Sequence, residues 1–348
     1  MEITAEITGV KYQPLLCNKL ETFDIEYLKE AFEKKSTFIL RLKDNNCFAL
    51  SWWVSAKRTR SYPYARVYNS LDFNGKRVTV IPILKDEGKD GDRDYLAWDT
   101  ISLMSLLGVY TIIAFYKNAV RNFNYKNKIT NQRFNIEYLK EKLSQLTYYQ
   151  SDALHWNIEQ LETVKDVGKA ALDSYKEISE NLNIEIHDLF TAKKRIGAIS
   201  ESKDSFMNLS RDLAKKAQNR ESLTTQPKEF VEGSKAKLTI KNYLGGNYYF
   251  TADEVRIEDN NIYLIECKHS NKNKLPSIDD IKDGLLKMIL FTNLKNVSVD
   301  SKKYSSISVL KLTSENGLNQ KYLNPKNKEL LDKLYKEASL NSFKVILN

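Results

Sequence analysis

The segment 248–270 constrains the fold of this chain most, because it places charged residues inside two apolar runs. The runs are "YYFTADEVRIE" (248–258) and "NIYLIECKHS" (261–270), and the turn residues "DNN" join them. Their β-branched and aromatic content predicts two short strands connected by a tight turn. Since a buried charge is costly unless it is paired or binds a metal, the second strand contains either a packed ion pair or a functional site.

Side-chain alternation sorts the charges of the second strand onto one face. Glu266 and Lys268 share that face with Leu264, whereas Cys267 points to the opposite, apolar face. Asp253 lies on the first strand and comes within reach of Glu266 across the turn. The hairpin therefore gathers two carboxylates and a lysine.

Two carboxylates and a lysine in this arrangement suit metal-dependent cleavage of a phosphodiester. Mg²⁺ prefers oxygen ligands, so we expect Asp253, Glu266 and the backbone carbonyl of Cys267 to bind it. The metal would polarise the phosphate and lower the pKa of a bound water, and Lys268 would orient that water and stabilise developing charge. Asp253, Glu266 and Lys268 are the predicted catalytic residues. The alternative is a simple ion pair between Glu266 and Lys268 on a solvated strand.

The stretch "TADEVRIEDNNIYLIECKHS" resembles the PD-(D/E)xK nuclease superfamily, to which most type II restriction endonucleases belong. Asp253 matches the first acid of the family motif, and Glu266-Cys267-Lys268 matches its E-x-K, while Ala252 replaces the name-giving proline. The resemblance covers roughly 229–294. It implies a mixed four-stranded core sheet flanked by helices, with Mg²⁺-dependent DNA cleavage.

Several neighbours of the motif have weaker candidate roles. In many family members an acid from the preceding helix joins the metal site, and Glu229 and Glu232 are the candidates here, although each is also typical of a solvated helix surface. Lys282 and Lys287 on the following helix could face phosphate, but a surface position is the simpler expectation. His269 alternates to the face opposite the motif.

The whole chain is predicted to be an α/β protein in three parts. Residues 1–130 form an N-terminal α/β domain and residues 131–215 a helical connector, in which apolar residues recur at steps of three and four. Residues 216–348 form the nuclease domain, with a restriction-endonuclease-like mixed sheet.

Further elements are expected on both sides of the connector. In the N-terminal domain, 36–84 has strand character, and the apolar run 101–115 indicates a buried helix leading into a buried strand. In the nuclease domain, we expect helices over 276–294 and 327–338 and a strand over 305–312, with Ser277 as a helix N-cap.

The stretch "SWWVSAKRTRSYPYARVY" (51–68) interleaves basic and aromatic residues. Arginine and lysine neutralise phosphates or read guanine edges, and aromatic rings stack on bases. One interpretation is a DNA-contacting strand and loop, and the other is an exposed basic strand whose aromatic residues pack the core. The candidate DNA contacts are Lys57, Arg58, Arg60, Tyr62, Tyr64 and Arg66.

Two features of the N-terminal half stay without an assigned chemistry. The acid-rich stretch 85–99 lacks calcium-loop spacing, so a surface loop is the simpler expectation. Residues 112–117, "IIAFYK", end a strand with a lysine but have Phe115 where an E-x-K would have its acid, which leaves a degenerate second nuclease-like half as a remote alternative.

Charge and cysteine usage limit the partners and the compartment. Lys+Arg number 54 and Asp+Glu 45, which gives a net charge of +9 and favours an anionic partner such as nucleic acid. The three cysteines and three histidines show no zinc spacing. We expect a cytoplasmic protein without a membrane span, since the longest apolar run is too short to cross a bilayer.

These features together predict a Mg²⁺-dependent endonuclease that cuts double-stranded DNA, of the type II restriction kind, with recognition by the N-terminal domain. A homodimer is expected by analogy, because such enzymes cut both strands. The alternatives are a repair or transposition nuclease of the same fold, and a non-catalytic DNA-binding protein with a vestigial nuclease fold.

Overall fold

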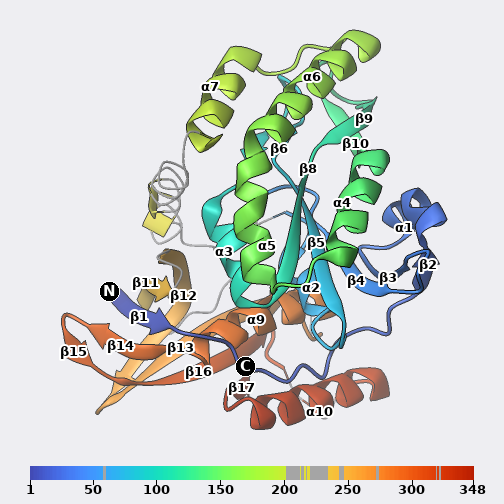
Figure 1. Ribbon diagram of the computed structural model, residues 1–348. Helices are drawn as coiled ribbons and strands as arrows, with labels where there is room; N and C mark the ends of the chain where they lie inside the picture. The colour runs from blue at the N-terminus through green and yellow to red at the C-terminus, as the bar shows by residue number, and fades with distance from the viewer. Residues whose placement is uncertain are drawn as a thin grey trace. The chain divides into compact units, whose positions relative to one another are not determined.

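A computed structural model divides the chain into two compact units, coloured by residue number in Figure 1. Unit 1 comprises Met1–Asn18 and Arg211–Asn348, and unit 2 comprises Lys19–Ser210. The structure describes residues 1–57, 60–200, 212, 215–216, 218–219, 234–242, 247–271, 274–318, 320 and 323–348.

Unit 1 is built on an eight-stranded mixed sheet with the strand order β15-β14-β1-β11-β12-β13-β16-β17. Parallel pairs join β1 to β11, β13 to β16 and β16 to β17, and the other neighbours are antiparallel. The strands are β1 (Glu2–Ile7), β11 (Ser234–Asn242), β12 (Asn247–Glu258), β13 (Asn261–Ser270), β14 (Lys295–Val299), β15 (Lys302–Lys303), β16 (Ser305–Ser314) and β17 (Lys344–Leu347).

Two described helices belong to this sheet. Helix α9 (Ile278–Phe291) packs against β13 and β16, and α10 (Pro325–Leu340) leads into β17. Ser277 caps α9 by accepting a hydrogen bond from the Asp280 N–H, and this confirms the predicted N-cap.

Unit 2 contains a five-stranded sheet with the order β2-β3-β4-β5-β8 and two separate hairpins, β6-β7 and β9-β10. The strands are β2 (Thr22–Asp24), β3 (Thr37–Arg41), β4 (Cys47–Trp52), β5 (Lys76–Pro82), β6 (Leu84–Asp86), β7 (Arg93–Tyr95), β8 (Val109–Ala114), β9 (Tyr116–Arg121) and β10 (Ile129–Phe134).

The helices of unit 2 pack on these strands, as the contacts of α4 and α5 with β8 and of α6 with β9 show. A short 3-10 turn (Ile25–Tyr27) precedes the first helix, and another (Gln160–Thr163) precedes α6. The helices are α1 (Leu28–Lys34), α2 (Pro63–Tyr68), α3 (Trp98–Leu106), α4 (Ile136–Tyr148), α5 (Ala153–Glu159), α6 (Val164–Leu182) and α7 (Leu189–Ser200).

The observed units differ from the predicted division into 1–130, 131–215 and 216–348. Strand β1 pairs in parallel with β11, so the first residues of the chain belong to the C-terminal sheet. The helices expected as a connector are part of unit 2: Trp156 Nε1 donates to the Thr111 carbonyl of β8 at 2.8 Å, and Asn157 Oδ1 accepts from the Thr111 N–H at 2.6 Å. Contacts between segments that are far apart in the sequence therefore determine which residues belong to each unit.

The mixed α/β class is confirmed, and several predicted elements are present. The run 101–115 forms α3 followed by β8, and the expected hairpin is β12 and β13. The sheet of unit 1 has eight strands instead of the four that the resemblance implies. The strand expected through residues 63–68 is wrong, because Pro63 starts the short helix α2 there; proline at the first helical position is well suited to the required φ.

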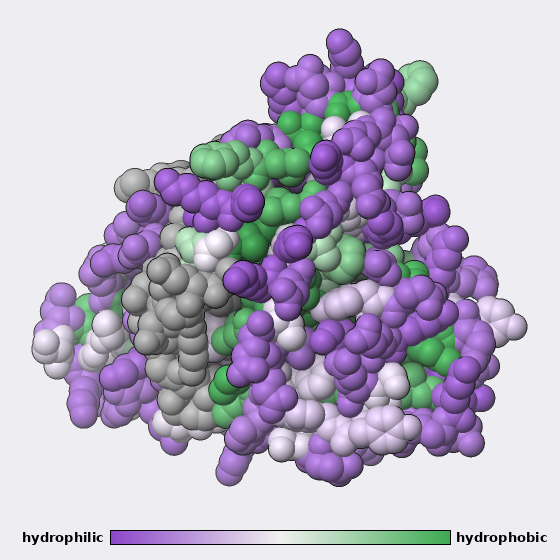
Figure 2. Space-filling model, turned by 45° about the horizontal axis from the view of Figure 1, so that its top comes forward, coloured by the Kyte–Doolittle hydropathy of each residue, from purple (hydrophilic) through white to green (hydrophobic). Residues whose placement is uncertain are grey.

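Hydrophilic residues cover most of the face in Figure 2, with smaller hydrophobic areas between them. This distribution agrees with a chain in which 28% of residues are charged. Within the part of the chain that the structure describes, no helix combines the length and apolar character that a bilayer crossing requires.

Candidate functional site

The hairpin of β12 and β13 places Asp253 opposite Glu266. The two strands pair from Glu258↔Asn261 to Glu254↔Ile265, and Asp259 in the turn has a φ of 54°. The next positions along this register are Asp253 and Glu266, so both side chains stand on the same face of the sheet.

A β-bulge in β12 lies at this point. The pairs Ser234↔Val255 and Ala236↔Ala252 span two steps on β11 and three on β12, so β12 carries one extra residue at Asp253–Glu254. Bulges bend a strand, end regular pairing and re-aim side chains, and they are frequent beside active sites. The regular pairing of β12 with β13 ends at the same point, and both acids there are buried, with Asp253 8% and Glu254 0% exposed.

Asp253 is fixed by the backbone of the E-x-K segment. Its Oδ2 accepts a hydrogen bond from the Cys267 N–H at 2.8 Å. Because the N–H and C=O of one residue in an extended strand point to the same side, the Cys267 carbonyl is directed to the side on which Asp253 lies. The predicted set of two carboxylates and one carbonyl is therefore gathered at one place.

Glu266 is almost completely buried, with 2% of its surface exposed, and it is surrounded by charged groups. Burial alone raises the pKa of its carboxyl group, but the charges of Lys287 and Lys268 and hydrogen bonds with Lys287 and Asp253 lower this pKa to about 2. Asp253 stands opposite Glu266 in the hairpin, so a cation bound here would balance part of the charge of two carboxylates.

Helix α9 approaches this face of the sheet closely at Gly284. A Cβ atom there would lie 2.8 Å from Leu310 Cδ1 and 3.2 Å from Lys268 Cε. Buried apolar residues on the same helix, including Ile281, Leu285 and Met288, hold it against the strands. Because Gly284 has no side chain, α9 lies close enough to the strands for its charged residues to reach the site.

Those residues are Asp283 and Lys287. Lys287 Nζ lies 2.7 Å from Glu266 Oε2, and Lys268 Nζ lies 3.0 Å from both Glu266 Oε1 and Asp283 Oδ2. Burial lowers the pKa of Lys268, but the charges of Glu266 and Asp283 outweigh it and hold this pKa above its ordinary value. Glu266 therefore bridges two ammonium groups, and Lys268 bridges two carboxylates.

The expectation that Lys282 and Lys287 are surface lysines is wrong for both. Lys282 is fully buried and donates to Asn18 Oδ1 at 2.8 Å. Lys287 belongs to the charged cluster. Asp283 was missed as a site residue, and Lys287 was named only as a weaker candidate, because helical spacing alone does not show which turn of α9 faces Glu266. The close approach at Gly284 was the available signal.

Other residues near the motif have structural partners. The Cys267 thiol packs with Ile265 and Val309 on the opposite face, where burial raises its pKa. On that face His269 Nδ1 lies 2.9 Å from Thr313 Oγ1, as its alternation predicts. Glu229 and Glu232 lie outside the described residues.

A second group of charges lies on the face of Cys267. Lys311 Nζ lies 3.1 Å from Glu254 Oε2, and Arg256 also pairs with Glu254. The charges of the hairpin are thus sorted into two networks, one on each face.

In unit 2, the basic stretch is paired with the acidic stretch 85–99. Arg60 Nε lies 2.9 Å from Asp94 Oδ2 and its NH1 3.1 Å from Glu87 Oε1, and it also pairs with Asp92. Lys57 Nζ lies 3.1 Å from Asp94 Oδ1. The acidic stretch is therefore a partner of the basic one and forms the β6–β7 hairpin, instead of the expected plain surface loop.

The other candidate DNA contacts differ in accessibility. Tyr64 is buried edge-on against Trp53, so its ring is part of the core. Arg66 donates to the Trp52 carbonyl at 2.9 Å and covers the indole ring of Trp52. Tyr62 is exposed at the start of α2, and Arg58 lies outside the described residues.

The segment considered as a degenerate nuclease half has no acidic counterpart in place. Phe115 is buried and packs against Tyr138, and Lys117 pairs with Glu177 of α6.

The donor set at Asp253 and Glu266 fits a magnesium ion that takes its remaining ligands from water and substrate. Mg²⁺ binds through one or two carboxylates and keeps several waters, and a cation here would balance the charges of two carboxylates that stand opposite each other. Across the described residues there is no group of three or more His, Cys, Asp or Glu side chains that could hold a metal ion. Any metal here would rest on the two carboxylates and the Cys267 carbonyl.

Comparison of the chain with protein-family models, with curated proteins and with solved structures finds no match.

Proposed function

We propose that unit 1 is a Mg²⁺-dependent nuclease that hydrolyses phosphodiester bonds in double-stranded DNA, as a type II restriction endonuclease does. The observation that carries this proposal is the position of Asp253 opposite Glu266 in the hairpin, with the Cys267 N–H on Asp253 and two lysines on Glu266. A bound Mg²⁺ would polarise the scissile phosphate and lower the pKa of a water. Asp253, Glu266 and the Cys267 carbonyl would hold it.

The charge of the cluster supports a phosphodiester as substrate. Asp253, Glu266 and Asp283 carry three negative charges when ionised, and Lys268 and Lys287 carry two positive ones, which leaves one negative charge. A divalent cation would convert this to one positive charge, which matches the single negative charge of a phosphodiester. Without the cation, the same cluster would repel the backbone of DNA.

The residues of the chain have distinct roles in this proposal. Lys268 is restrained by Glu266 and Asp283, so its ammonium group is held in one place to orient the attacking water and to stabilise charge on phosphorus. The Cys267 N–H keeps Asp253 in its rotamer. Lys287 holds the second oxygen of Glu266.

The decisive experiment incubates the full-length protein with long unmethylated duplex DNA, with Mg²⁺ or with a chelator. We expect cleavage only with Mg²⁺, and no cleavage by Glu266→Gln. Glu329→Gln, on an exposed pair with Lys333 of α10, is the matched control and should cut like the wild type. Discrete fragments would favour restriction, and a smear would favour a repair or transposition nuclease of this fold.

One observation favours a second candidate, a DNA-binding protein without catalysis. Both oxygens of Glu266 already contact an ammonium group, which is also what a structural ion-pair network requires. Titration with Mg²⁺ separates the two functions, because a vestigial site should bind no Mg²⁺, whereas the nuclease should lose Mg²⁺ binding on Asp253→Asn.

A further inference from the structure

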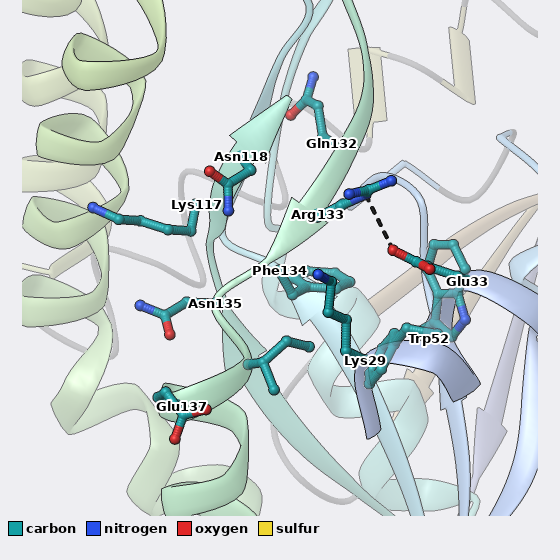
Figure 3. Close-up of a pocket in the computed structure, with 12 residues that line it drawn as sticks. Lys29, Glu33, Trp52, Lys117, Asn118, Gln132, Arg133, Phe134, Asn135 and Glu137 are labelled. Atoms are coloured by element: carbon teal, nitrogen blue, oxygen red, sulfur yellow. Dashed lines mark ion pairs between the residues drawn. The ribbon is translucent and has the colours of Figure 1, made fainter. Parts of the chain in front are cut away.

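A pocket of about 230 Å³ opens in unit 2 beside α1, the end of β4 and the β9–β10 hairpin (Figure 3). Phe32, Trp52 and Phe134 line it. Their ring centroids lie 5.7–6.2 Å apart, at 46° to 88° to one another. They form one continuous aromatic surface, on which a planar ligand could lie against one ring and touch the edges of the others.

This aromatic surface is held in place from behind. Trp52 Nε1 donates to the Lys35 carbonyl at 2.8 Å, and the Arg66 guanidinium lies 4.4 Å from the centroid of its ring. Phe134 stacks on the buried Tyr116 at 4.4 Å. The rings are therefore fixed before any ligand arrives, which reduces the entropic cost of binding.

Most polar residues of the pocket are already engaged with other parts of unit 2. Gln132 uses both ends of its amide, donating to the Asp86 carbonyl at 2.7 Å and accepting from the Tyr175 hydroxyl at 2.6 Å. Figure 3 shows Arg133 paired with Glu33, at 3.4 Å. These residues shape the pocket.

Lys29 and Asn118 differ from them. Figure 3 shows Lys29 extending in front of Phe134 and Asn118 on the strand above it. Both side chains are exposed, and neither forms a hydrogen bond or an ion pair with another residue that the structure describes. An ammonium group and an amide with both donor and acceptor atoms are thus available beside a fixed aromatic surface.

We propose that this pocket binds a single unpaired nucleobase of a nucleotide, with the base stacked on one ring of the aromatic surface, that of Trp52, and touching the edges of the others. The Asn118 amide pairs with the edge of the base, since it offers both a donor and an acceptor, and Lys29 contacts the phosphate. A planar ring, a hydrogen-bonding edge and an anion are the three parts of a nucleotide that these groups complement. The acids at the rim do not oppose it, because Glu33 pairs with Arg133 and Glu137 with Lys140.

The test uses full-length protein in the presence of a chelator, so that nuclease activity in unit 1 plays no part and the two proposals can fail separately. Binding is measured with the four deoxynucleoside monophosphates and with a short fluorescent single strand. Binding of free nucleotides assigns the pocket to a soluble nucleotide, and binding of the strand alone assigns it to a base within a strand; either supports the proposal. No binding of either probe would overturn it.

Variants decide whether this pocket is the site. Lys29→Glu is expected to weaken binding about fivefold or more and to lower the salt slope by about 0.7, the value for one phosphate contact on a single strand. Trp52→Ala is expected to weaken binding about 5- to 150-fold, which corresponds to about 1–3 kcal/mol per stacked base. Lys43→Glu, on an exposed lysine of unit 2 outside the pocket lining, is the control and should leave affinity unchanged. Unaltered affinity in Lys29→Glu, which is exposed and should fold normally, would refute the proposal, as would equally tight binding of neutral indole.

Discussion

Lys287 Nζ donates a hydrogen bond to Glu266 Oε2 at 2.7 Å, across 21 positions of sequence. It also lies 3.5 Å from the Thr251 carbonyl of β12. A lysine from α9 thus reaches the same carboxylate as Lys268 of the E-x-K motif and approaches the strand that carries Asp253. The candidate site is made by three elements of unit 1, β12, β13 and α9.

Replacement of Lys287 by methionine should reduce DNA cleavage about 10–100-fold, because Lys287 holds the second oxygen of Glu266 and groups that orient a functional residue contribute about this much. Lys287→Arg should retain part of the activity, since it keeps the charge. The measurement is single-turnover cleavage with Mg²⁺, with circular dichroism to check folding. Lys336→Met, at an exposed position on α10, is the control.

Asp283→Asn should lower the cleavage rate about tenfold with little effect on DNA affinity. Asp283 acts through Lys268, whose ammonium group it holds at 3.0 Å, and groups that orient a functional residue contribute about 10–100-fold. Asp283→Glu should recover part of the rate. An equal loss in both variants, or a loss of folding stability without a change in rate, would contradict the positioning role.

Glu266 should make stability depend on pH in acid. Its pKa is lowered from 4.5 to about 2 in the folded protein, so the ionised form stabilises the fold above the unfolded pKa. This stabilisation is lost as the pH falls from about 5 towards 2, and it amounts to about 3 kcal/mol at 1.36 kcal/mol per pKa unit. Urea unfolding across this range should show the difference between wild type and Glu266→Gln narrowing as the pH falls. A difference that stays constant would contradict the assignment.

The sequence was sufficient for the hairpin and for its main charges. Alternation places Glu266 and Lys268 on one face and Cys267 on the other, and the structure has this arrangement. Local patterns are sufficient here because a strand with apolar residues on one face has only one register in which those residues are buried. Helix α9 and its N-cap were also predicted from a local pattern, the helical spacing of its apolar residues and the serine that precedes them.

Other parts of the site depend on contacts that no local pattern contains. The bulge at Asp253–Glu254 arises from pairing with β11, and β11 itself pairs with the first strand of the chain. The partners of Arg60 are carboxylates far along the chain, among them Asp94. Alternating basic and aromatic residues in 51–68 suggested a strand, but Pro63 and the burial of Tyr64 and Tyr68 give a helix packed on the core.

Arg60→Ala should destabilise unit 2 instead of only weakening DNA binding. Its guanidinium group contacts Asp94 and Glu87, whose side chains are 2% and 12% exposed, and removal of one partner leaves buried carboxylates with less compensation. We expect a loss of about 2–3 kcal/mol, below the usual 3–5 kcal/mol for a broken buried pair, because Lys57 and Lys85 still contact these acids. Arg41→Ala, in an exposed pair with Asp24, should cost well under 1 kcal/mol. Denaturant unfolding measures both, and the salt dependence of DNA binding tests the other role of Arg60: a slope lower by about one with unchanged stability would restore Arg60 as a phosphate contact.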